Sequence, residues 1–186
     1  MTPQRYFLAQ AYNNAWANHR LLRACRQLSA TELVTRRTGF FPSIIHTLNH
    51  NLTVDWFYLS ALEGEPTGIK AFEPEIPFLL IIDLEREQRA VDRRLIDHCR
   101  QLDPDMLALE VTIPRGEKNQ FERNDRLLLH LFQHQIHHRG QVHAMLSGTG
   151  VAPPQLDEFF PADPGEQALR RPDFIELGFS ETQIWG

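Results

Sequence analysis

Four stretches of the chain carry apolar side chains at the three- and four-residue spacing of a helix, and helix-breaking residues separate them. Thr2 followed by a proline suits the start of the first helix, and Asn124 or Asp125 suits the N-cap of the fourth. The second stretch is apolar on more than one face, which indicates a helix buried on several sides. The pattern predicts helices over residues 3–29, 42–63, 79–102 and 124–147.

The connections between these helices differ in length and character. Residues 64–77 hold three prolines and two glycines and predict a long loop that crosses the bundle. Residues 107–123 alternate apolar and polar positions around a Pro-Arg-Gly turn, which favours a small irregular hairpin. The tail, residues 151–186, is rich in aromatic side chains and should pack against the bundle or a partner subunit. Together these features predict an all-α four-helix bundle.

Length and charge narrow the class of protein. At about 150 residues per domain, a chain of 186 residues predicts a single domain over residues 1–186. With 19 Lys and Arg against 24 Asp and Glu, the net charge is −5. This acidic balance argues against a partner such as nucleic acid or an anionic membrane surface, whose binding needs an excess of positive charge.

Three further features favour a cytoplasmic protein. The longest aliphatic or aromatic run covers only residues 78–82, far short of the roughly 20 residues that span a bilayer. The first residues include Gln, Arg and Asn where a signal peptide would be apolar, so we expect no secretion. Cys25 and Cys99 form no CxxC motif and are expected to be reduced core residues.

Histidines are the unusual part of the composition, because five of the nine fall between residues 130 and 143. His134 and His138 lie one helical turn apart on one face, where two imidazoles can converge on one metal ion. A third ligand should come from another helix, and His50 lies on an apolar face of the helix over 42–63. The alternative is a pH-sensitive or merely polar core, and His19, His98 and His143 are read as ordinary surface or core residues.

The sequence excludes two other kinds of metal site. A zincin protease needs a glutamate directly after the first histidine as its general base, but this chain has Gln135 there. A di-iron carboxylate bundle needs Glu-x-x-His pairs, and no glutamate here is followed by a histidine three positions later.

Several of these segments resemble the DinB/YfiT-like family of bundle metalloproteins. The similarity extends over about 150 residues, and its most specific part is the segment of the fourth helix that holds His130, His134 and His138. The segments that carry the resemblance are Trp16-Ala17-Asn18, residues 41–50 with Asp55-Trp56, residues 130–141, and the start of the tail at residues 153–160.

The resemblance implies a four-helix bundle, usually a homodimer, with one divalent ion per chain, zinc or nickel, held by three histidines. The family's first ligand corresponds to His50, with His46 as the rival one turn earlier, and the other two correspond to His134 and His138. Related members include bacillithiol-dependent transferases and mycothiol-dependent maleylpyruvate isomerases. A small-molecule substrate, such as a low-molecular-weight thiol, is therefore expected.

These considerations lead to two hypotheses of function. The first is an enzyme in which a divalent ion activates a thiol for transfer or a water for hydrolysis. Gln141, one turn after His138, could orient the nucleophile, and Asn49 or Asp55 could support the ligands from behind. Arg139 points away from His138 and is read as a packing or ion-pair residue. The alternative is a non-enzymatic, dimeric metal-binding protein in which the ion stabilises the bundle.

Overall fold

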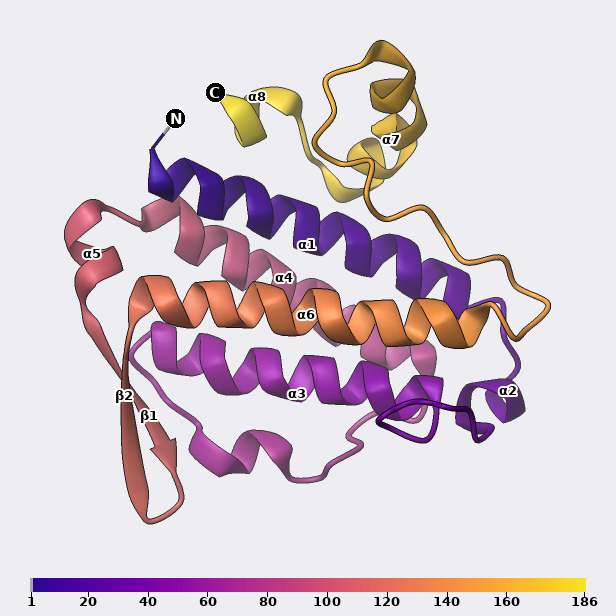
Figure 1. The fold of residues 1–186 in the computed structure, drawn as a ribbon, viewed down its shortest axis with the longest axis horizontal. Coiled ribbons are helices and arrows are strands. Elements are labelled where there is room, and N and C mark those ends of the chain that lie inside the picture. Colours follow the sequence, from indigo (N-terminus) through magenta and orange to yellow (C-terminus); the bar gives the residue numbers. More distant parts are fainter. Residues whose placement is uncertain (1) are drawn as a thin grey trace.

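The computed structural model describes residues 2–186 and consists mainly of helices (Figure 1). Four long helices form a bundle, which confirms the predicted fold class. They are α1 (Pro3–Cys25), α3 (Ile44–Leu62), α4 (Ile81–Gln101) and α6 (Asn124–Leu146). Their buried faces meet in one apolar core, in which Trp16, Leu52 and Leu128 are completely enclosed. None of the helices in residues 2–186 combines the length and the apolar character needed to cross a membrane.

The helices run in two directions. In Figure 1, α1 and α6 run one way, whereas α3 and α4 run the other. The parallel arrangement of α3 and α4 requires the chain to return along the bundle between them. The predicted crossover makes this return, and it contains the short helix η1 (Gly68–Phe72). As a result α3 packs antiparallel against α6, and these two helices carry the candidate ligands.

The ends of the four long helices differ from the prediction by one to four residues. The first helix ends at Cys25 because Ser29 caps a separate short helix, α2 (Ala30–Val34), in a capping box with Glu32. The next long helix starts at Ile44, since the Ser43 side chain accepts a hydrogen bond from the His46 backbone. The N-cap of α6 is Arg123 rather than Asn124 or Asp125.

The predicted hairpin is confirmed. After the short helix α5 (Pro104–Ala108), strands β1 (Glu110–Arg115) and β2 (Lys118–Arg123) pair antiparallel from Glu110↔Arg123 to Arg115↔Lys118. The turn between them uses Gly116, whose φ of +70° is a conformation that glycine adopts without strain. Val111 and Ile113 are buried, so one face of β1 packs against the bundle.

The tail packs on the bundle, as predicted, and it forms two helices that the periodicity did not reveal. These are α7 (Pro164–Leu177) and α8 (Glu181–Trp185), which lie beside α1 (Figure 1). Phe159 is buried against Trp16, with ring centroids 5.5 Å apart. The Asp173 carboxylate accepts hydrogen bonds from Trp16 Nε1 and Arg20 Nε, at 3.2 and 2.8 Å. An apolar contact and a partly buried ion pair therefore anchor the tail.

The two cysteines are buried and unbonded, as expected. Burial raises the pKa of each thiol to about 12, so neither supplies a thiolate at neutral pH.

Candidate metal centre

Three histidine rings from two helices meet at the contact between α3 and α6. His50 extends from α3, and His134 and His138 extend from successive turns of α6. Each offers one ring nitrogen, and these three nitrogens lie within 4.8 Å of one another. The Nε2 atoms of His50 and His134 are 3.1 Å apart. The structure thus brings together the three side chains that the sequence singled out.

The 3.1 Å between His50 Nε2 and His134 Nε2 is close to the spacing of two ligands around one small cation, and the third nitrogen lies within 4.8 Å of both. Two nitrogens bound to zinc at the usual 2.0–2.1 Å with a tetrahedral angle lie about 3.3 Å apart. Three imidazole nitrogens that face one another in this way could hold a metal ion.

The amide of Gln141 determines which nitrogen of His138 is available. Its Oε1 is 2.8 Å from His138 Nδ1, and its Nε2 is 3.0 Å from His137 Nε2. Because the amide oxygen can only accept, His138 donates its Nδ1–H and keeps the Nε2 lone pair free. Gln141 therefore orients the ring of His138, which is how outer hydrogen bonds fix metal-binding histidines in other proteins.

Burial keeps the three rings neutral. The pKa of His50 falls to about 4 and that of His134 to about 3, first because burial disfavours the imidazolium form and then because neighbouring histidines repel added charge. Burial also lowers the pKa of His138. Neutral imidazole is the form that binds metals, so the rings are in their ligating state at neutral pH.

Phe41, on the loop between α2 and α3, covers one side of the histidine group. Its ring centroid is 4.3 Å from that of His50 and 5.6 Å from that of His138. The ring of His46 also contacts this phenylalanine, with centroids 4.7 Å apart, and His46 Nε2 is 2.9 Å from Glu75 Oε1. Among the described residues, His50 and not His46 completes the group of three.

Asn49 and Asp55 make their hydrogen bonds elsewhere. The amide nitrogen of Asn49 donates to the backbone carbonyls of Ile45 and Phe78, and its amide oxygen accepts from the backbone N–H of Phe78. The two bonds to Phe78 attach the crossover to α3. Asp55 accepts from Gln88 on α4. Within residues 2–186 neither side chain hydrogen bonds to the three histidines, whereas Gln141 does.

A second polar cluster lies deeper in the bundle, beside the histidines. Arg139 is buried, as its packing role required, and its Nη1 donates to Asn14, Asn18 and Gln135. Burial raises the pKa of Asp55 to about 7 and that of Asp92 to about 6, and it lowers that of Arg139 to about 10. The amide-carboxylate cluster, as we call it, consists of Asn14, Asn18, Asp55, Gln88, Asp92, Gln135 and Arg139.

The sequence reasoning missed most of this cluster, although a signal was present. Three helices each carry a pair of polar residues four positions apart on a face that is otherwise apolar. The pairs are Asn14 with Asn18, Gln88 with Asp92, and Gln135 with Arg139.

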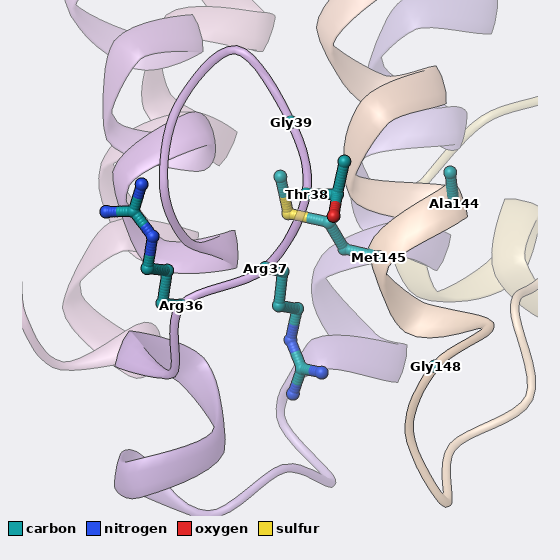
Figure 2. A pocket seen from close by; sticks show the side chains of 7 residues that line it. All are labelled: Arg36, Arg37, Thr38, Gly39, Ala144, Met145 and Gly148. Atoms are coloured by element: carbon teal, nitrogen blue, oxygen red, sulfur yellow. The ribbon is translucent and has the colours of Figure 1, made fainter.

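A surface pocket of about 750 Å³ lies near the histidines without including them. The loop that carries Phe41 forms one wall through Arg36, Arg37 and Gly39, and Met145 near the end of α6 forms the other. Figure 2 shows that the two guanidinium groups extend in different directions instead of converging on one point. The candidate centre is therefore defined by its converging ring nitrogens and not by this pocket.

Comparisons with known proteins bear on the family and the fold of the chain. The model of the DinB family matches residues 4–168. The uncharacterized protein YizA of Bacillus subtilis (strain 168) is 27% identical over 118 residues, which cover 63% of this chain and 72% of that protein. The crystal structure of a DinB-like protein from Bacillus cereus ATCC 10987 has a TM-score of 0.59 at 16% identity, over 75% of this chain and 90% of that one.

The structural likeness at this identity supports the fold alone. The family model, in contrast, matches most of the sequence, including all three histidines of the group. The chain belongs to the DinB family.

Proposed function

We propose that His50, His134 and His138 hold one divalent metal ion, zinc or nickel, and that the protein is an enzyme that activates a thiol or a water there. The observation that carries this proposal is the convergence of three neutral imidazole nitrogens within 4.8 Å. Three protein ligands are also the number typical of catalytic zinc sites, which keep a position for water or substrate, whereas structural sites have four.

When bound, such an ion supplies positive charge that lowers the pKa of a water toward 7 or favours the thiolate form of a thiol. The protein's own residues would prepare the site for this chemistry. Gln141 holds His138 in the tautomer that presents Nε2, and Phe41 shields His50 and His138 on one side. The exposed ring of His137, to which Gln141 donates, extends the polar surface beside the group.

The metal content of protein purified without an affinity tag tests the first half of the proposal. We expect about one equivalent of zinc or nickel per chain in the wild type, and its loss in His134→Ala and His138→Ala. Comparing His50→Ala with His46→Ala then tests the third ligand. Loss in His50→Ala and retention in His46→Ala is the expected result, and retention in His50→Ala would refute the assignment.

Access to the metal separates an enzyme from the structural alternative. Protein loaded with Co²⁺ should change its visible spectrum when azide or a small thiol is added, because a site with three protein ligands leaves room for an exogenous one. A spectrum that does not respond, together with unfolding on chelation, would instead support a metal that only stabilises the bundle.

We also propose that the protein forms a homodimer through the face shared by α1 and α6. A groove of about 700 Å³ runs between these helices, and none of the described residues that line it is charged. Tyr6, Leu129 and Ile136 are 62%, 61% and 47% exposed there. The polar side chains of the groove are Tyr6 with its hydroxyl, the amides of Gln10 and Gln133, and the indole of Trp185.

A second copy of the chain fits this groove better than a charged partner does. In a two-fold dimer each patch faces itself, so a charge at its centre would meet a like charge. Amides both donate and accept, so each can pair with its counterpart. Sedimentation should show a dimer for the wild type, a monomer for Leu129→Glu, and a dimer for the control Ile175→Glu, which alters an exposed residue of α7. A monomeric wild type would overturn the proposal.

A further inference from the structure

The residues that directly follow the three histidines in the sequence are themselves connected by hydrogen bonds. Each histidine is followed by a residue of one buried hydrogen-bond network. Asn51 follows His50, Gln135 follows His134, and Arg139 follows His138. All three following residues are buried, at 2%, 0% and 4% exposure, whereas His50 and His134 are only partly buried.

The network links α3 to α6 immediately beside the histidines. Gln135 Nε2 donates to the backbone carbonyl of Asn51 at 3.5 Å. Gln135 Oε1 in turn accepts from Arg139 Nη1 at 3.2 Å. These bonds join the positions next to all three rings, across the interface that the rings themselves span.

The same network fixes α6 to the other two helices of the bundle. Arg139 Nη1 donates to the side-chain oxygens of Asn14 and Asn18 on α1. Those two asparagines donate through Nδ2 to Asp92 Oδ1 on α4, at 3.2 and 2.9 Å. All four long helices therefore contribute to the hydrogen bonds that set the orientation of α6.

The orientation of α6 matters because metal coordination tolerates little displacement. An imidazole nitrogen lies roughly 6 Å from the helix axis, so a rotation of α6 by about 20° would move it by about 2 Å. Metal–ligand distances normally stay within about 0.2 Å of their ideal values. Directional hydrogen bonds on the neighbouring face oppose such a rotation, because they weaken steeply when donor and acceptor are misaligned.

We propose that Gln135 and Arg139 are positioning residues for the metal centre: through Asn51, Asn14 and Asn18 they fix the rotation of α6 so that His134 and His138 face His50. This inference rests on the proposed metal site. It assigns to the buried cluster a role in the geometry and affinity of the site, in addition to its part in stability.

The test compares two network variants with a control that weakens the fold elsewhere. Gln135→Met keeps the side-chain length but removes both hydrogen bonds, and Arg139→Lys keeps the charge but loses the planar group that reaches two asparagines. The control Asp173→Asn loosens the tail from Trp16 and Arg20 without touching the network. For each protein we would measure the Co²⁺ visible spectrum, the affinity for Zn²⁺ and the thermal midpoint.

Both network variants should show an altered Co²⁺ spectrum and about tenfold or greater loss of Zn²⁺ affinity, the range found for outer residues of metal sites. Asp173→Asn should keep the wild-type spectrum and Zn²⁺ affinity even if its thermal midpoint falls as far as those of the two network variants. Wild-type spectra and affinities in Gln135→Met and Arg139→Lys would overturn the inference while leaving the metal site intact. Absence of metal binding by the wild type would instead overturn the proposed function itself.

Discussion

The bundle contains two groups of polar side chains that lie next to each other and differ in almost every physical respect. The amide-carboxylate cluster is sealed, with Asn14, Gln135 and Arg139 all under 5% exposed, and its donors face its acceptors. The histidine group is half-open, and its ring nitrogens face one another, with 3.1 Å between His50 Nε2 and His134 Nε2.

The difference shows how a binding site can be distinguished from a structural network in a helical core. The amide-carboxylate cluster satisfies all but one of its buried side-chain atoms, Asp55 Oδ1, so it has little left to offer a ligand. The histidine nitrogens, in contrast, can satisfy one another only through a shared proton or a cation, so this group can still bind a ligand. Proximity and burial alone would have selected the amide-carboxylate cluster, whereas counting donors and acceptors selects the histidines.

The largest expected effect concerns the charge at the centre of the sealed cluster. Arg139→Met would leave Asp55 and Asp92 buried without their compensating cation, and we expect the free energy of unfolding to fall by about 3–5 kcal/mol. Urea denaturation measures this. The matched control Arg93→Met, at an exposed position of α4, should change it by no more than about 0.5 kcal/mol. A loss below about 1 kcal/mol in Arg139→Met would show that the cluster is not held by its charges.

The histidine group should respond to metal instead. Zn²⁺ at about 100 times its dissociation constant should raise the free energy of unfolding of the wild type by about 2.7 kcal/mol, because the ion binds the folded state. His134→Ala should gain nothing, while in the metal-free state it should remain folded. Denaturation with Zn²⁺ and with a chelator gives both values. An equal gain in His134→Ala would place the stabilising ion elsewhere.

The third prediction uses the pKa of Asp55, which burial raises from an ordinary value near 3.8 to about 7. A raised pKa means that the folded state favours the protonated acid, so the stability this group contributes is present below about pH 4 and is lost as the pH rises through 7. Asp55→Asn removes that loss. Its free energy of unfolding should therefore improve relative to the wild type between pH 4 and pH 7, by at least about 1 kcal/mol.

The control for this pH series is Ser60→Ala, which alters a buried polar residue of the same helix that does not titrate. The difference in the free energy of unfolding between Ser60→Ala and the wild type should stay constant between pH 4 and pH 7. A constant difference for Asp55→Asn as well would mean that Asp55 is ionised in the folded state throughout, paired with Arg139.

The sequence was sufficient to predict the bundle and the pair of His134 and His138, because both depend on spacing along a helix. It could not choose between His50 and His46, since residues four apart lie on the same face and the choice depends on where α6 packs along α3. In the structure Glu75 of the crossover binds His46, and no local pattern indicates that contact. The polar pairs on three helices signal the cluster around Arg139, but its bonds join four helices, and no pattern within one helix gives the partners.

The tail helices were missed for a different reason. Asp163 followed by proline is a strong helix start, and Gly178, with a φ of +72°, is a typical helix end. Pro172 between them suggests a break, yet it lies within α7. The tertiary contacts of Phe174 and Asp173 with the rest of the protein hold this helix together despite the proline.

The smallest expected effect is at the edge of the histidine group, where Gln141 bonds His138. Gln141→Leu removes an amide that is only partly buried, so the metal-free protein should keep its free energy of unfolding within about 0.5 kcal/mol. Without that acceptor, His138 is free to change tautomer and rotate, and Zn²⁺ affinity should fall about tenfold, or about 1.4 kcal/mol. Competition with a chelator of known affinity measures this. Since Gln141 belongs to no buried network, loss of affinity at unchanged stability would show that the open site is tuned from its solvent side as well as from the core. Unchanged affinity would confine that tuning to the sealed cluster.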